Sequence, residues 1–431
     1  MLQRVPHVYT TPSSPDSARH WVPCVDGLWE RCTWDFEFIV PNALETASDD
    51  DQGDIGNETV PIMVVCSGEL IEKVAHPHDS KKSIFVYSQT VPTSVQHIAF
   101  AIGPFHLHSI PLESSTMDPS MNGSTPGPGG LSLSRVSIHT FCLPGLEASL
   151  RASTSFYRQA MSFFTTEYGS YPFGSFKVVF VDELPAERFD GSAIVLATND
   201  LLHDDMAIDQ VFDTRQALAH ALACQWVGVN IIPKSWSDLW LVNGLGFYIT
   251  SLFIRRHFGN NEYRFRLRKD MDRVVSMDTG NMPPLCAQAS SEPPDPTVLA
   301  FINVKAPIVL YILDRRLGKS GTALGLSRVL PKVFLTAISG EMANNAVSTH
   351  SFLRTCRKVS GVDIRSFSDQ WIFGSGCPNF KFRATFNKKK MAVELNMAQH
   401  TPAYLYNDHD PARMLLYNPV QAFEVWLLFY N

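Results

Sequence analysis

The residues with the clearest chemical potential lie between Ala217 and Phe247. His220 and Cys224 stand four positions apart in a stretch with helical periodicity, so we expect their side chains to share one face of a helix. A hydrolytic zinc site on a helix needs two histidines at this spacing, with a glutamate beside the first to activate the metal-bound water. Here Ala221 follows His220, and Cys224 stands where the second histidine would be. Of the two histidines and the glutamate, only the first histidine, His220, is therefore present.

The neighbouring positions weaken a catalytic interpretation further. A third zinc ligand would come from the next predicted helix, where Asn243 offers only a neutral amide. Loss of general-base help alone lowers a hydrolytic rate by roughly 10²–10⁴. Cys224 as a nucleophile is disfavoured, because reactive cysteines prefer helix N-termini or exposed electropositive sites and Cys224 falls within an apolar stretch. We therefore predict a hydrogen-bonded His220 and a buried thiol, rather than a catalytic or structural metal site.

The rest of the sequence predicts the elements that position these residues. Up to about residue 145, short β-branched and aromatic segments alternate with turn signals, as in antiparallel sheets. Helical periodicity then dominates, and a capping-box pattern places one helix start at Asp213. A β-hairpin is predicted from about Asn379. The predicted strands are Phe173–Asp182 and Ser192–Asp200, and the predicted helices cover residues 146–168, 213–228, 237–259, 262–277, 299–317, 324–338, 348–359 and 363–373.

Composition bounds the classes of function. The chain has 431 residues, of which 45% are hydrophobic, and its formal net charge is −6. This length predicts about two or three domains. A negative net charge disfavours non-specific nucleic-acid binding through the phosphate backbone. Two short basic clusters are interpreted first as solvated surface; they are also the candidate DNA contacts, namely Arg264, Arg266, Arg268, Lys269, Lys388, Lys389 and Lys390.

The cysteines and the absence of targeting segments predict a compartment. The chain has 8 cysteines, widely spread and without a C-x-x-C pair, which favours free thiols in a reducing environment. Residues 1–14 lack the apolar segment of a secretory signal peptide. No run of about 18 uncharged apolar residues predicts a membrane span. We expect the cytosol or the nucleus.

The stretch that contains His220 resembles the core of the aminopeptidase N family of zinc peptidases. His220–Gly228 and Ser237–Gly244 have the sequences HALACQWVG and SDLWLVNG, similar to HExxHQWWG and NDLWLNEG in that family. Upstream, Ala18–Asp26 (ARHWVPCVD) is similar to its ARxWFPCFD, and Ile98–Phe105 (IAFAIGPF) is similar to its LAFVVGDF. The resemblance implies a thermolysin-like fold and identifies His220, Cys224 and Asn243 with the family's three metal-ligand positions.

Two further family motifs are altered. The substrate-binding GAMEN motif has no good counterpart, since the aligned region is Gly191–Val195. The transition-state tyrosine falls at Asn303. These differences argue against a pseudoenzyme that still binds peptide amino termini. The competing enzyme hypothesis is a zinc-dependent aminopeptidase with atypical ligands.

One branch of the superfamily is more similar still. The segments Trp21–Pro41, Ser235–Leu241 (SWSDLWL) and Phe258–Arg264 (FGNNEYR) closely resemble the aminopeptidase-like TBP-associated factors of the general transcription factor TFIID, and this resemblance spans about residues 18–395. It implies a nuclear, non-catalytic scaffold without a cofactor. Such a scaffold acts in RNA polymerase II preinitiation complex assembly, through contacts with other TBP-associated factors and with core-promoter DNA.

We therefore expect a multidomain α+β protein. An antiparallel β-domain (1–142), with low-complexity loops at 45–59 and 114–134 that should be mobile, precedes a thermolysin-like, mostly helical domain (143–377). Residues 378–431 are expected to begin a β-sandwich-like third domain. Relative to the family, we expect the chain to be truncated at both its start and its end.

Overall fold

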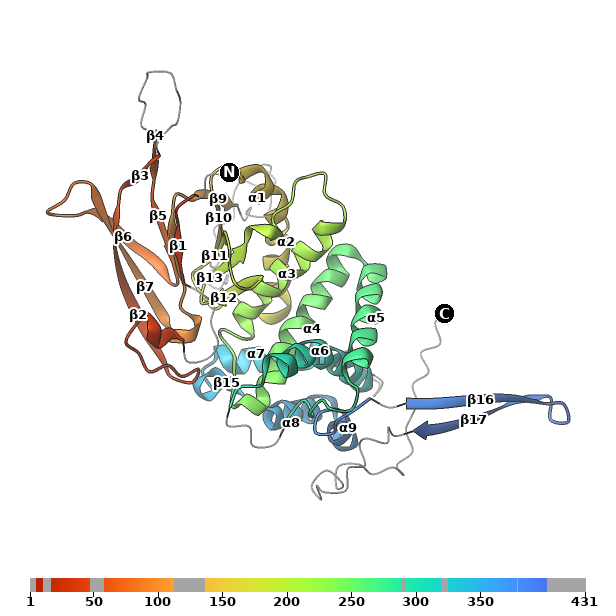
Figure 1. Cartoon of the computed structure of the whole chain (residues 1–431). Helices are drawn as coiled ribbons and strands as arrows, with labels where there is room; N and C mark the ends of the chain where they lie inside the picture. Colours follow the sequence, from red (N-terminus) through yellow and green to blue (C-terminus); the bar gives the residue numbers. More distant parts are fainter. Residues whose placement is uncertain are drawn as a thin grey trace, which may run out of the picture.

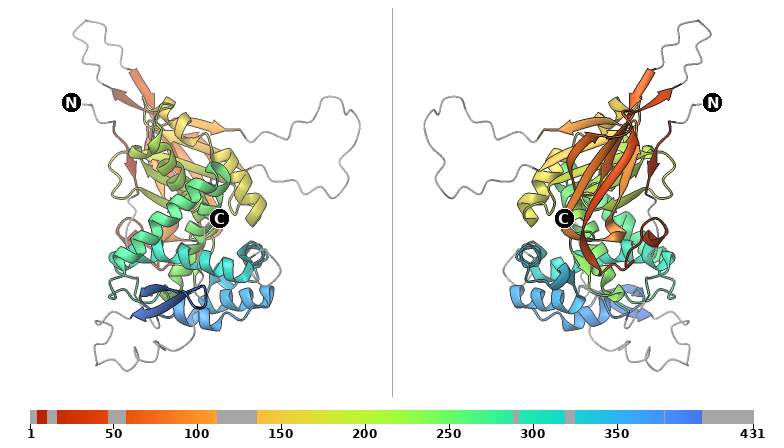
Figure 2. Two further views of the ribbon diagram at one scale, coloured as in Figure 1. Left: turned by 90° about the vertical axis from the view of Figure 1, so that its right-hand side faces the viewer. Right: turned by 90° about the vertical axis from the view of Figure 1, so that its left-hand side faces the viewer.

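The computed structural model describes residues 5–10, 17–46, 58–111, 136–287, 292–318, 325–377 and 379–400. Antiparallel sheets form one side of the molecule and helices the other (Figure 1). The hairpin of β3 (Ala43–Thr46) and β4 (Glu58–Pro61) lies at the opposite end from helices α8 (Thr349–Ser360) and α9 (Arg365–Trp371) (Figure 2). The predicted α+β class, with antiparallel sheets ahead of a helical region, is confirmed. The loop at 114–134, and residues 47–57 of the other loop, lie outside the described residues.

Two antiparallel sheets face each other in the first part of the chain. Alternation places Phe85 and Tyr87 of the first sheet against Val64 and Cys66 of the second, and the Tyr87 hydroxyl donates to the Val64 carbonyl at 2.6 Å. The β3–β4 hairpin extends into the first predicted loop, which is therefore shorter than expected. The strands, in sheet order, are β2 (Arg31–Pro41), β7 (Lys82–Ser94) and β6 (Glu69–Ala75); β1 (Val8–Tyr9), β8 (Phe100–Gly103) and β5 (Met63–Cys66); and β3 (Ala43–Thr46) with β4 (Glu58–Pro61).

A five-stranded mixed sheet joins the β-region to the helices. Its order is β12-β13-β11-β10-β9, and β12 is an edge strand. The central strand β11 is buried along its whole length; Val178 and Phe180 face the helices, while Val179 and Val181 face the β-region. This sheet extends across residue 142, so a domain boundary there stays a prediction. The strands are β9 (His106–Ile110), β10 (Ser137–Cys142), β11 (Ser175–Val181), β12 (Arg188–Gly191) and β13 (Ile194–Thr198).

Helices pack on the other face of this sheet and on one another. The predicted helix at 146–168 is two helices, because the chain breaks at Ser155 and Phe156. The capping-box prediction was wrong: α3 begins at Asp209, and Asp213 lies inside it. The helices are α1 (Glu147–Thr154), α2 (Tyr157–Tyr168), α3 (Asp209–Trp226), α4 (Leu239–Phe258), α5 (Asn260–Met277), α6 (Pro296–Gly318), α7 (Gly325–Ile338), α8 (Thr349–Ser360) and α9 (Arg365–Trp371).

Two of these helical segments have the length and composition of a membrane span. They are Trp236–Phe258 and Pro296–Gly318, and the buried shares of their most apolar windows are 67% and 50%. Their helices α4 and α6 pack against each other, and both contribute to the main hydrophobic core. They have the burial expected of core helices in a folded domain.

A two-stranded hairpin follows the helices and extends away from them (Figure 1). It pairs β16 (Asn379–Asn387) with β17 (Ala392–His400), as the sequence predicts. The remainder of the expected third domain, residues 401–431, lies outside the described residues. A β-sandwich-like domain therefore stays a prediction.

Candidate functional site

Helices α3 and α4 hold the residues that the sequence singles out. The inner face of α3 is rich in alanine, and α4 carries Gly244 and Gly246 where it meets its neighbours. A Cβ atom on Gly246 would lie 3.2 Å from Nε2 of His220, and one on Gly244 would lie 2.8 Å from the Ala306 side chain. Glycine at these two positions therefore permits the close approach of α4 to α3 and to α6.

His220 is enclosed on several sides. Its side chain points from α3 towards α4, where the Phe247 ring stacks on the imidazole at a centroid distance of 3.8 Å. Its Nε2 atom lies 3.6 Å from the Cys224 sulfur, as the spacing of four residues predicts. Only 7% of the residue's surface is exposed. The pair is thus in contact in a largely dry environment.

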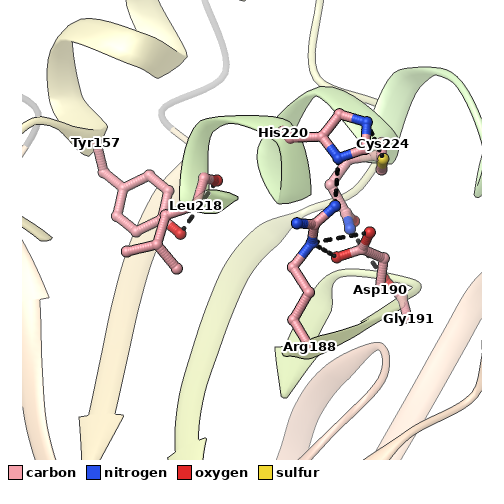
Figure 3. A network of polar contacts seen from close by, with 8 residues as sticks. Tyr157, Arg188, Asp190, Gly191, Leu218, His220 and Cys224 are labelled. Carbon is pink, nitrogen blue, oxygen red and sulfur yellow. Dashed lines mark hydrogen bonds and ion pairs between the residues drawn. The ribbon is translucent and has the colours of Figure 1, made fainter. Parts of the chain in front are cut away.

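An arginine from another element completes the surroundings of His220 (Figure 3). Arg188 lies on the edge strand β12, and its Nη2 atom donates to Nδ1 of His220. The guanidinium Nε also pairs with the Asp190 carboxylate at 3.0 Å. Residues two apart on a strand share a face, which is why Arg188 and Asp190 point together towards α3. The sequence interpretation did not include either residue.

Electrostatics fix the charge state of this cluster. Burial lowers the pKa of the His220 imidazole well below its usual value, and the Arg188 guanidinium lowers it further. Burial raises the pKa of the Cys224 thiol well above its usual value, and the Asp190 carboxylate raises it further. Burial opposes the charge on Arg188, but the Asp190 carboxylate, the hydrogen bond to it and the neighbouring Cys224 and Glu187 together outweigh burial, so the pKa of Arg188 is raised. The imidazole of His220 and the thiol of Cys224 are therefore neutral at pH 7, beside the Arg188–Asp190 ion pair.

The positions of the third ligand and of the family tyrosine are also in contact. Asn243 of α4 donates through its amide nitrogen to the amide oxygen of Asn303 in α6, at 2.9 Å. Two residues further along α6, Lys305 forms a buried ion pair with Asp278 at 3.3 Å. This part of the site is an amide–amide contact between two helices, with no carboxylate in the place of a ligand.

The frame around the cluster is held by the Gln225 and Trp226 side chains. The Gln225 amide donates to the Gly191 carbonyl at 2.9 Å and accepts from the Ala193 amide at 3.0 Å, which attaches α3 to β12 and to the turn that leads to β13. The Trp226 indole donates to the Gly169 carbonyl at 3.3 Å. On the far side of α3, the Tyr157 hydroxyl donates to the Leu218 carbonyl at 3.4 Å (Figure 3).

The predicted basic clusters lie away from this centre. Arg264, Arg268 and Lys269 are exposed on α5, whereas Arg266 of the same helix pairs with Glu262 at 2.6 Å and with Asp213 at 3.0 Å. The other cluster occupies the turn between β16 and β17, where Lys390 pairs with Glu394 at 3.1 Å. The hairpin extends away from α5, so the structure does not merge the two clusters into one patch (Figure 1). The basic residues of the turn between β16 and β17 are Lys388, Lys389 and Lys390.

Comparison with known families decides the ancestry of this centre. The profile of the Peptidase family M1 domain matches residues 153–371, which is about half of the chain and includes α3, α4 and α6. The chain belongs to the peptidase M1 family. Its centre around His220 can therefore be compared with the zinc centre that the family resemblance implies.

Curated relatives within this wider similarity carry a transcription name. The chain is 39% identical to transcription initiation factor TFIID subunit 2 of Schizosaccharomyces pombe, over 92% of this chain and 36% of that protein. It is 28% identical to the protein of the same name in Saccharomyces cerevisiae, over 89% of this chain and 34% of that protein. The chain thus spans about a third of the length of these relatives. A leucyl aminopeptidase of Saccharolobus solfataricus is 23% identical over 58% of the chain.

Solved M1 structures share the fold. The M1 zinc metallopeptidase from Deinococcus radiodurans superposes with a TM-score of 0.61 and 17% identity, over 86% of this chain and 70% of that one. A two-domain M1 zinc metallopeptidase bound to L-tryptophan gives a TM-score of 0.63 over 86% of this chain. At this level of identity the likeness extends to the fold alone.

The M1 centre of this chain does not fit a zinc ion. Zinc sites are built from thiolate, imidazole and carboxylate ligands, whereas here the third position, Asn243, is a neutral amide bound to Asn303. The His220 imidazole is already hydrogen-bonded to Arg188, a fixed cation. Among the residues that the structure describes, no group of three or more His, Cys, Asp or Glu side chains could hold a metal ion.

Arg188 was missed because sequence spacing carries no signal for it. It lies 32 residues before His220, on a short edge strand rather than on the helix pair. The alternation of Arg188 and Asp190 within β12 was the available clue, since it places two opposite charges on one face of a strand. Finding their partner on α3 required the sheet topology.

Proposed function

We propose that this chain is a non-catalytic scaffold portion of a TFIID subunit, acting in RNA polymerase II preinitiation complex assembly. The observation that carries the proposal is the Arg188–His220 contact, which puts a protein cation against the imidazole that a zinc peptidase would use to bind its metal. The relatives named TFIID subunit 2 support the transcription role. A nuclear location and contacts with other TBP-associated factors are part of the same proposal.

Co-purification tests the scaffold proposal. The tagged full chain is purified from nuclear extract of its source cells, and the associated proteins are identified by mass spectrometry. TFIID subunits should be enriched over a tagged unrelated M1 aminopeptidase used as the control bait. Recovery of the chain from the cytosol, or from the nucleus without TFIID subunits, would contradict the proposal.

We further propose that DNA, where this chain contacts it, lies along the exposed basic face of α5. Arg264, Arg268 and Lys269 are exposed there, and Arg268 shares its charge with Asp272 at 3.2 Å. Arg266 contributes little to such a surface, because Glu262 and Asp213 engage its guanidinium. Phosphate contacts by a few side chains should make the affinity weak and dependent on salt. The turn residues Lys388, Lys389 and Lys390 form a second, separate candidate contact.

A salt titration tests the DNA proposal. Binding of the full chain to core-promoter duplex is measured by fluorescence anisotropy at several salt concentrations. Each phosphate contact should contribute roughly 0.9 to the slope of log affinity against log salt concentration. The control is the variant in which Arg264, Arg268 and Lys269 are all replaced by glutamine. Affinity that is absent, or that does not depend on salt, would contradict the proposal.

A further inference from the structure

We propose that the Arg188 guanidinium is a built-in cation that replaces the metal ion at His220. It joins the edge strand β12 to helix α3. It also blocks metal binding, because its hydrogen bond takes up the lone pair of the His220 Nδ1 atom. The inference concerns the architecture of the centre and holds whether or not the chain assembles into TFIID.

The hydrogen bond from Arg188 determines the tautomer of His220. A guanidinium has donors and no acceptor, so the Nδ1 atom that it contacts must be the unprotonated nitrogen of the imidazole. The ring proton of a neutral His220 is then on Nε2, which faces the Cys224 sulfur at 3.6 Å. One ring nitrogen thus accepts from Arg188, and the other carries a proton. No lone pair remains for a metal.

The local charges balance without an ion. Arg188 and Asp190 are both largely buried, with side-chain exposures of 14% and 20%, and their 3.0 Å contact leaves the cluster formally neutral. A divalent cation at His220 would sit beside the guanidinium, and Asn243, which is hydrogen-bonded to Asn303, would offer it only a neutral amide. Like charges at close range in a low-dielectric environment repel strongly. The site therefore favours the arginine over a metal.

Steric contacts leave little freedom for another arrangement. Phe247 covers one face of the imidazole, and Gly246 passes so close that a Cβ atom would come within 3.2 Å of Nε2. Gln225 holds β12 to α3 independently, through the Gly191 carbonyl. Arg188 thus reaches His220 from a strand that is already fixed in position, which is the arrangement expected of a permanent replacement.

Nitrogen NMR on the unmodified protein tests the tautomer. The full chain is labelled with ¹⁵N-histidine, and the His220 signals are identified by their loss in His220→Gln. We expect a proton on Nε2 and a bare Nδ1. A proton on Nδ1 would overturn the proposal.

Restoring the missing ligands tests the block. One variant carries Cys224→His and Asn243→Glu, and a second carries the same changes with Arg188→Met. Zinc is measured by elemental analysis after dialysis, and cobalt binding by its visible absorption. We expect stoichiometric metal only in the variant that lacks Arg188. Equal binding by both variants shows that Arg188 is no block, and binding by neither shows that something else excludes the ion; either result overturns the proposal.

A matched control keeps the result specific to the site. Arg256→Met removes an exposed arginine from α4 and is added to the same ligand-restoring pair. It should leave the variant without metal. Circular dichroism of every variant confirms that the helices are retained before metal is measured, and Arg188→Lys, which keeps the charge, should block metal like the native residue.

Discussion

The buried centre around His220 and the exposed face of α5 differ in how their charged side chains are solvated and paired. At the centre, Arg188 and Asp190 neutralise each other within 3.0 Å and are largely removed from water. On α5, Arg264 and Lys269 face solvent, and the pairs formed by Arg268 and Arg273 are themselves exposed. The comparison separates two roles: the buried charges maintain the inherited frame, and the exposed charges are available to a partner.

The largest effect should come from breaking the buried pair. Arg188→Met leaves the Asp190 carboxylate largely buried without its cationic partner, which should lower the free energy of unfolding by about 3–5 kcal/mol. Urea denaturation followed by circular dichroism measures the change. Adding Asp190→Leu should recover most of the loss, because the unpaired charge is then removed. A loss no larger than that of the exposed Arg256→Met control would show that the centre does not hold the frame.

The next largest effect should be a loss of stability in acid. Burial and, to a lesser degree, the Arg31 guanidinium lower the pKa of His97 to about 4. The backbone carbonyl of His97 accepts a hydrogen bond of 2.7 Å from the backbone amide of Ser192, which follows β12. As the pH falls, the His97 imidazole is protonated near pH 6.5 in the unfolded chain but only near pH 4 in the folded protein. Stability contributed by the neutral ring is therefore complete above about pH 6.5 and falls by up to about 3 kcal/mol as the pH approaches 4.

Chemical denaturation at several pH values checks this dependence. His97→Gln, which cannot be protonated, should flatten the profile between pH 6.5 and 4. His220 should contribute in the same direction, because its pKa is also lowered. A profile that is flat in native protein, or equally steep in His97→Gln, would contradict the assignment.

A smaller effect is expected from the inward-facing arginine of α5. Arg266→Ala removes ion pairs with Glu262 and Asp213 that are partly exposed, so the free energy of unfolding should fall by about 1 kcal/mol. DNA affinity should change little, since this guanidinium is already engaged. Denaturation and anisotropy on the same sample separate the two outcomes; a large loss of DNA affinity without a loss of stability would reverse the roles given to Arg266 and Arg264.

The smallest effect on stability should come from the exposed face itself. Replacing Arg264, Arg268 and Lys269 with alanine should change the free energy of unfolding by no more than about 0.5 kcal/mol. The same variant should lose salt-dependent affinity for promoter duplex. Thermal denaturation measures the first quantity and anisotropy the second. Marked destabilisation would mean that this face is structural, and the contrast with the buried centre would disappear.

The sequence predicted elements better than it predicted their contacts. Helical periodicity located α4 and α8 to within about two residues, because their apolar faces and their flanking glycines and serines are local signals. The start of α3 was misplaced, since Asp213 and Gln216 make a capping-box pattern inside a helix that begins earlier. A local pattern cannot show that the preceding turn is also helical.

The contacts of the candidate site likewise include some that the sequence indicates and one that it does not. The contact of His220 with Cys224 follows from helix spacing. The family resemblance singled out Asn243 and Asn303 separately, and the structure shows that their side chains are in contact. The contact with Arg188 follows from neither, because it depends on the pairing of β12 with β13 at the edge of the sheet next to α3. Long-range pairing between a strand and a helix was the information that the sequence lacked.

An aminopeptidase assay tests the central claim most directly. The purified full chain, supplied with zinc, is incubated with arylamides of all the common amino acids, and the released arylamine is measured. We predict no release above that of the heat-denatured chain, because the imidazole that would bind the metal is held by Arg188 and no general base follows it. Arylamine release that requires zinc and is abolished by His220→Ala would contradict the account.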